Sequence, residues 1–115
     1  MSEEKRGHRR FPIQLGCELG LGGRSVPAAT RNLSRGGVAL ALSRPLEEGQ
    51  PVRLTLFLLE DGIEDPNEEP FELAAQVQWT AEGDDPTLFL AGLNFMGLEP
   101  AQQERLEHFL GRLDE

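Results

Sequence analysis

The strict alternation of apolar and polar residues is the feature that most limits what this chain can fold into. Every odd position from Phe11 to Leu21 is apolar, and the same pattern returns from Phe71 to Ala81. A period of two residues places successive side chains on opposite faces of a strand, so one face can be buried while the other meets solvent. The chain is therefore predicted to be built from half-buried β-strands.

Shorter alternating segments extend this pattern, and glycine- or proline-containing turns separate them. β-Strands are expected at residues 11–21, 25–31, 38–42, 52–58, 71–81 and 88–95. Antiparallel strands at this spacing are predicted to close into a barrel, because closure removes the exposed edges of a sheet.

The C-terminal segment has a different period. Leu106, Phe109, Leu110 and Leu113 recur at the three- and four-residue spacing of one helix face, and Pro100 suits the first turn of a helix. The predicted fold class is therefore all-β: a six-stranded antiparallel β-barrel with one C-terminal α-helix.

Two side chains on the apolar strand faces have competing interpretations. Cys17 shares its face with Leu15 and Leu19, so we expect a small core residue rather than a reactive thiol. Trp79 alternates with Val77, so it is predicted to lie in the core rather than to form a base-stacking platform. A single cysteine excludes an internal disulfide and a multi-cysteine metal site.

The sequence shows none of the patterns that carry catalysis or metal binding. His8 and His108 lie far apart, and no glycine follows the acidic residues at 60–70 at the position that an EF-hand loop requires. We expect neither an enzyme nor a bound metal or cofactor. No apolar run approaches the roughly 20 residues of a membrane-spanning helix, and the polar start is no signal peptide. A cytoplasmic protein without membrane insertion is predicted.

Charge is divided unevenly along the chain, whose formal net charge is −9. Residues 5–53 contain nine Lys and Arg against three acids, whereas residues 54–115 contain two Arg against fifteen acids. This asymmetry indicates a local anion site on an otherwise negative molecule. A nucleic-acid-binding β-barrel is disfavoured, since long nucleic acids need an extended basic surface.

Basic residues are concentrated directly ahead of the first strand. Four of them lie within six residues: Lys5, Arg6, Arg9 and Arg10. Guanidinium groups are planar, always charged and able to hold a phosphate through two hydrogen bonds. Because the segment offers the core little apolar surface, residues 1–10 are predicted to be a flexible basic arm ahead of a single domain at 11–115. A merely solvated tail is the alternative interpretation.

A second polar cluster, Asn32-Leu33-Ser34-Arg35-Gly36-Gly37, interrupts the strand pattern. Asn and Ser side chains can hydrogen-bond the backbone nearby, and paired glycines permit a positive φ or the close approach of a ligand. Taken alone, this segment predicts an ordinary turn.

Together the two clusters resemble the signatures of the PilZ domain, the bacterial receptor module for cyclic di-GMP. Arg6-x-x-x-Arg10 stands before the first predicted strand, and Asn32-x-Ser34-x-x-Gly37 stands between the second and third. The resemblance covers nearly the whole chain and includes Gln76–Trp79, Ala91–Phe95 and the closing helix.

The resemblance implies a role in binding cyclic di-GMP for each motif residue. Arg6 and Arg10 take guanine edges and phosphates, because guanine presents adjacent O6 and N7 acceptors that arginine meets bidentately. Asn32 and Ser34 supply hydrogen-bonding side chains on the barrel surface, and Gly37 leaves room for the ligand. Auxiliary contacts are expected from Lys5, Arg9 and Arg35.

The stoichiometry of the ligand stays open. A basic residue at the position of Lys5 tends in this family to accompany a stacked ligand dimer. Lysine, however, can neither stack on a flat ring nor form bidentate hydrogen bonds as arginine does.

The expected function is that of a receptor in which cyclic di-GMP neutralises the arginines and orders residues 1–10 against the Asn32–Gly37 turn. An effector protein then reads the new surface. The alternative is a PilZ-like adaptor that needs no nucleotide and acts through protein contacts in bacterial motility or surface regulation. The sequence does not determine the oligomeric state.

Overall fold

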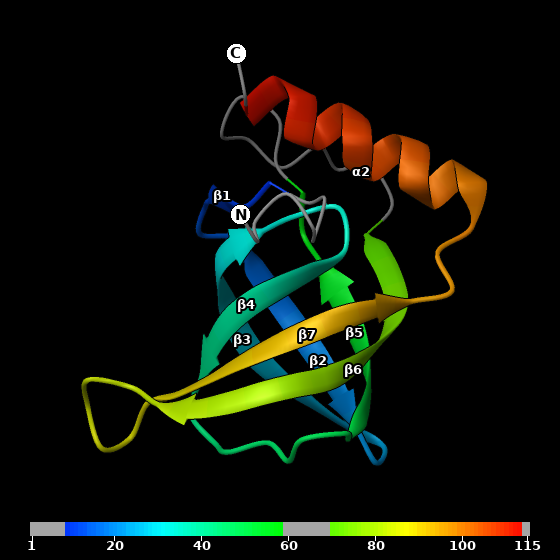
Figure 1. Cartoon of the computed structure of the whole chain (residues 1–115). Helices are drawn as coiled ribbons and strands as arrows, with labels where there is room; N and C mark the ends of the chain where they lie inside the picture. The colour runs from blue at the N-terminus through cyan, green and yellow to red at the C-terminus, as the bar shows by residue number, and fades with distance from the viewer. Residues whose placement is uncertain (1–8, 59–69, 114–115) are drawn as a thin grey trace.

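A β-sheet and a C-terminal helix make up the fold in the computed structural model, which describes residues 9–58 and 70–113 (Figure 1). The strands are β1 (Phe11–Pro12), β2 (Gly16–Leu21), β3 (Arg24–Leu33), β4 (Gly37–Leu42), β5 (Pro51–Leu56), β6 (Phe71–Glu82) and β7 (Phe89–Met96). The helix is α2 (Pro100–Leu113).

The sheet closes on itself. Its strand order is β1-β3-β2-β5-β6-β7-β4, and an additional pairing between β3 and β4 joins the two sides. Six strands, β2 to β7, therefore form an antiparallel barrel, and β1 is an extra strand that pairs with β3. The predicted six-stranded antiparallel barrel with a C-terminal helix is confirmed.

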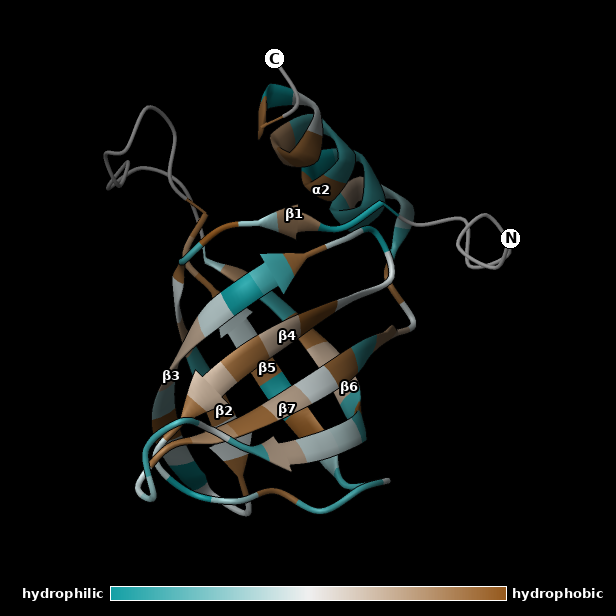
Figure 2. Cartoon of the chain, turned by 60° about the vertical axis from the view of Figure 1, so that its left-hand side comes forward, coloured by the Kyte–Doolittle hydropathy of each residue, from teal (hydrophilic) through white to brown (hydrophobic). Residues whose placement is uncertain are grey.

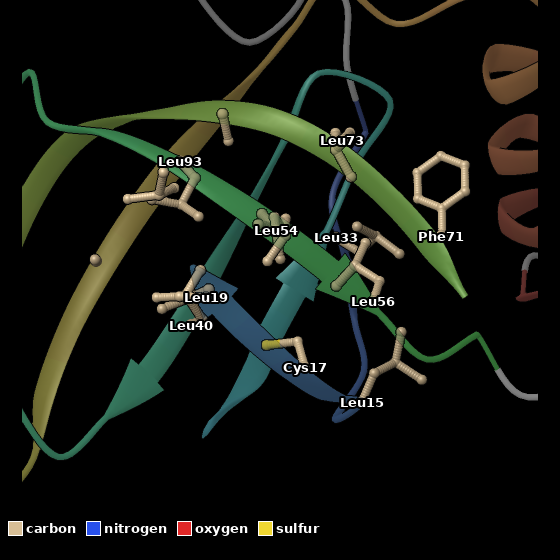
Figure 3. Packing of buried hydrophobic residues seen from close by; sticks show 14 of the residues in the cluster. Leu15, Cys17, Leu19, Leu33, Leu40, Leu54, Leu56, Phe71, Leu73 and Leu93 are labelled. Carbon is tan, nitrogen blue, oxygen red and sulfur yellow. The ribbon is translucent and has the colours of Figure 1, made fainter. Parts of the chain in front are cut away.

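Leucine side chains from opposite sides of the barrel fill its interior, as Figure 3 shows for Leu19, Leu40 and Leu54, each of which is fully buried. Cys17 lies among them, and burial raises the pKa of its thiol to about 12, with a smaller contribution from the Glu18 carboxylate. A thiol with so high a pKa stays protonated at neutral pH, and only the thiolate is a good nucleophile. The prediction that Cys17 is a core residue is confirmed.

The first predicted strand is divided in two. Its register against β3 changes by one residue between the pairs Pro12–Asn32 and Gly16–Ala29. The buried Thr30 side chain bridges this step. Its Oγ1 accepts a hydrogen bond from the N–H of Leu15 (2.8 Å) and donates one to the backbone carbonyl of Ile13 (2.6 Å). A single strand over residues 11–21 was therefore the wrong expectation, since Thr30 supplies the hydrogen bonds that an unbroken ladder would make.

The prediction that Trp79 lies in the core is wrong. The register of β6 against β7 shifts between Val77, which pairs with Leu93, and Trp79, which pairs with Gly92. One extra residue in a strand reverses which face the following side chains occupy. Val77 is buried, whereas Trp79 is 40% exposed on the outside of the barrel.

Helix α2 lies across one end of the barrel, the end at which β1 also lies (Figure 1, Figure 2). It buries Leu106, Phe109 and Leu110 against the core, as its helical period predicts. The Gln102 side chain donates a hydrogen bond to the Glu72 carbonyl of β6 (2.7 Å) and fixes the start of the helix. Within residues 9–58 and 70–113, no helix combines the length and hydropathy needed to cross a bilayer.

Two predicted segments fall mostly outside the described residues. These are the acidic loop at residues 60–70 and the basic arm at residues 1–10.

Candidate functional site

Arg10 and Asn32 bring the two sequence motifs into direct contact. Arg10 Nη1 donates a hydrogen bond to Asn32 Oδ1 at 2.7 Å, across 22 positions of sequence. β1 makes this contact possible, because its pairing of Pro12 with Asn32 carries the chain past the end of β3. The Arg10 side chain is exposed, so its remaining N–H groups can meet a ligand from solvent.

Arg9 is placed beside Arg10 by the start of β1. Its guanidinium lies 4.8 Å from the centroid of the Phe11 ring, and Phe11 packs against the core. This cation–π contact holds a second positive charge at the same end of the barrel. Lys5 and Arg6, the other predicted basic contacts, lie outside the described residues.

Ser34 is not on the barrel surface, contrary to the sequence-based expectation. It is 2% exposed, and its Oγ accepts hydrogen bonds from the N–H groups of Gly36 and Gly37, each at 3.2 Å. The Ser34 N–H donates to the Gly37 carbonyl at 2.9 Å. The side chain therefore shapes the turn between β3 and β4, since its oxygen is occupied by the backbone of that turn.

We expect Ser34→Ala to lower the free energy of unfolding by about 1–3 kcal/mol, because it leaves buried N–H groups without their acceptor. Chemical denaturation measures the change. Ser43→Ala removes an exposed hydroxyl and is the matched control, with no expected effect. Unchanged stability together with weaker ligand binding would instead show that Ser34 contacts the ligand directly.

Gly37 begins β4, and the backbone that approaches it is that of β7. A Cβ atom at this position would overlap the Leu93 carbonyl oxygen. The glycine therefore permits close strand packing, and its φ is not positive. The expectation that Gly37 also leaves room for a ligand stays a prediction.

Arg35 is the exposed residue of the same turn, and it reaches the helix. Its Nη2 lies 2.7 Å from Glu107 Oε2, with the two side chains 57% and 47% exposed. This ion pair between the turn and α2 was not predicted from the sequence. No local signal could reveal it, because the partners are 72 positions apart.

A small pocket lies between that turn and α2. Its volume is about 150 Å³, and its lining includes Arg35, Leu98 and Glu107. Sites for small molecules usually measure about 300–1,000 Å³, so this pocket is too small for a dinucleotide. In the described part of the chain, no three His, Cys, Asp or Glu side chains gather closely enough to hold a metal ion.

Comparison with protein families matches the chain from residue 4 to residue 112 to the PilZ domain. The chain belongs to the PilZ domain family. Both motifs and all of α2 except its last residue lie inside the matched region. A search of curated proteins found no match.

Solved PilZ structures share the barrel. The Bacillus subtilis inhibitor of motility MotI (DgrA) has a TM-score of 0.76 at 20% identity, over 94% of this chain and 50% of its own. The PilZ domain of YcgR from Escherichia coli, solved with c-di-GMP, has a TM-score of 0.73 at 17% identity, over 93% and 89%. The PilZ domain of CeSA from a cellulose-synthesizing bacterium has a TM-score of 0.65 at 22% identity, over 93% and 99%.

At these identities the likeness shows the fold. This PilZ domain spans only half the length of MotI.

Proposed function

We propose that this PilZ domain is a receptor for cyclic di-GMP, which binds where the N-terminal basic segment meets the Asn32–Gly37 turn. The hydrogen bond between Arg10 and Asn32 is the observation that supports this most strongly, because it joins both family motifs at one exposed place. YcgR and the PlzA protein of Borreliella burgdorferi, which share the fold, were both solved with c-di-GMP.

The chemistry of the site suits that ligand. Cyclic di-GMP carries two phosphate charges and two guanines, and each guanine presents O6 and N7 on one edge. Asn32 holds the Arg10 guanidinium at the barrel surface before ligand arrives, which reduces the entropy lost on binding. Arg9 adds positive charge beside it. Lys5 and Arg6 are proposed to complete the contacts, while Ser34 and Gly37 keep the turn in shape.

Binding is proposed to order residues 1–10 against the barrel. Like-charged guanidinium groups repel one another unless an anion lies between them, so ligand removes a barrier to packing this segment. Ordering costs about 1–2 kcal/mol per residue fixed, so only part of the contact energy would appear as affinity. The ordered segment would form a new surface for an effector protein.

Isothermal calorimetry tests the receptor function. Cyclic di-GMP should give saturable heat, whose midpoint yields the affinity and whose stoichiometry separates one ligand from a stacked dimer. Cyclic di-AMP is the matched control, because adenine offers one acceptor and one donor where guanine offers two acceptors to arginine. No heat with either nucleotide would refute the receptor function and favour the nucleotide-independent adaptor.

The ion pair of Arg35 and Glu107 gives a second test of which arginines reach the ligand. If Arg35 contacts cyclic di-GMP, the Glu107 carboxylate competes with the ligand phosphates for the Arg35 guanidinium. Removing the negative charge with Glu107→Gln should then strengthen binding by about two- to fivefold, since an exposed pair is worth up to about 1 kcal/mol.

Glu104→Gln removes an exposed charge from the same helix and serves as the control for net charge. Equal affinities of the two variants in calorimetry would show that Arg35 stays away from the ligand.

A further inference from the structure

Strand register links the proposed binding site to Trp79 across the outside of the barrel. Asn32 of β3 pairs with Ala39 of β4, Ala39 pairs with Gly92 of β7, and Gly92 pairs with Trp79 of β6. These four residues form one row, which we call the outer row. Neighbouring strands lie about 4.8 Å apart, so the row measures at most about 14 Å from end to end.

Trp79 is presented on this row by two local features. The register shift after Val77 turns the indole outward, where the residue is 40% exposed. Gly92 leaves space beneath it: a Cβ atom there would overlap the indole Nε1. The indole is therefore supported on one side by the β7 backbone and stays accessible to solvent.

The two residues between Asn32 and Trp79 on the outer row are the small residues Ala39 and Gly92. Ala39 carries only a methyl group and Gly92 no side chain, and both are buried, so the accessible surface of the outer row lies at its two ends, Asn32 and Trp79. The next row, also read from the strand pairings, consists of apolar residues: Ala29, Ala41, Leu90 and Ala81. Against its β3 side lies a shallow hollow of about 660 Å³, whose lining includes Ala29, Arg31, Ala41 and Leu88.

An accessible indole next to a row of apolar residues that are at least partly exposed suits a flat ring. Nucleobases stack on aromatic side chains, and each stacked base typically contributes enough that alanine substitution weakens binding by about 5- to 100-fold. Guanidinium groups at Arg10 and Arg9 lie at the other end of the row and suit the charged part of a nucleotide. The outer row thus offers polar contacts at one end and an aromatic contact at the other.

We propose that Trp79 is the platform on which one guanine of cyclic di-GMP stacks, with the ligand lying along the outer row between Arg10 and Trp79. This inference rests on the proposed receptor function. One guanine is held near the arginines, and the other rests on the indole two strands beyond Ala39.

Intrinsic fluorescence reads this contact directly, because the chain has a single tryptophan. Cyclic di-GMP should quench the emission of the wild-type protein, with the same midpoint as the heat of binding. Trp79→Leu keeps an apolar side chain but removes the ring, and its affinity in calorimetry should fall by about 5- to 100-fold. Trp79→Phe should stay within about threefold of wild type.

Met96→Ala is the matched control, since Met96 is the exposed apolar residue of β7 and lies outside the row. Its affinity should equal that of wild type. Wild-type heat without quenching, or full affinity in Trp79→Leu, would overturn the platform and leave the receptor function intact. Absence of heat with the wild-type protein would overturn the receptor function and this role of Trp79 together. If Trp79→Leu fails to fold, quenching of the wild type still decides between these outcomes.

Discussion

Replacing Arg10 by alanine is expected to weaken binding of cyclic di-GMP by about tenfold or more. The change removes a bidentate contact to a guanine edge, which is worth about 1–3 kcal/mol. It also frees Asn32, whose Oδ1 holds the Arg10 side chain at 2.7 Å in the absence of ligand. Because Arg10 is exposed, the melting temperature should change little. Calorimetry and thermal denaturation measure the two quantities.

Two variants control this experiment. Arg24→Ala removes an exposed arginine at the opposite end of the ten-residue strand β3 from Asn32 and should bind as wild type does. Arg10→Lys keeps the charge but loses the planar fork, so it should recover only part of the affinity. Wild-type affinity in Arg10→Ala would place the ligand elsewhere. Arg6→Ala, although outside the described residues, is expected to behave as Arg10→Ala does.

Gly37→Ala should be the most damaging change to stability among the motif residues. The added Cβ overlaps the Leu93 carbonyl oxygen, which is part of the β7 backbone and cannot move without disturbing the pairing of β4 with β7. Forced overpacking of this kind costs about 3 kcal/mol, equivalent to a melting temperature about 10 °C lower. Loss of ligand binding would follow from loss of the fold.

The same substitution at Gly111 is the control. A Cβ there meets nothing within 4 Å, and alanine favours the helix by up to about 1 kcal/mol. Its melting temperature should therefore stay constant or rise. If Gly37→Ala melts like the wild type yet no longer binds cyclic di-GMP, the glycine serves the ligand rather than the strand packing.

The barrel could be predicted from sequence because its signal is local. Alternation identifies a strand wherever one face is buried, and the spacing of Leu106, Phe109 and Leu110 identifies the helix in the same way. The division of the first strand could not be predicted, since it depends on hydrogen bonds from Thr30, a residue of another strand. The position of Trp79 was predicted wrongly because one extra residue in β6 reverses which face of the strand the following side chains occupy. The residue types along the strand give no sign of this change.

The candidate site was identified by family resemblance, and the structure changes the expected roles of some of its members. Asn32 and Arg10 are in direct contact, as expected of two motif residues that are proposed to bind the same ligand. Ser34 hydrogen-bonds the backbone of its turn and Gly37 permits close packing against β7, which the motif alone does not reveal. The partner of Arg35 depends on the docking of α2 onto the barrel, and local sequence carries no information about that tertiary contact.

Hydrogen exchange with and without cyclic di-GMP tests the central claim most directly, because it locates both the binding site and the ordering of the arm. Added ligand should slow the exchange of amides in residues 1–10 and in the Asn32–Gly37 turn. The amides of β5, on the side of the barrel away from the site, are held by the core and should not change. If the amides of residues 1–10 exchange equally slowly before and after saturation with cyclic di-GMP, ligand-induced ordering is contradicted. If the exchange of the Asn32–Gly37 amides is also unchanged, binding at this site is contradicted.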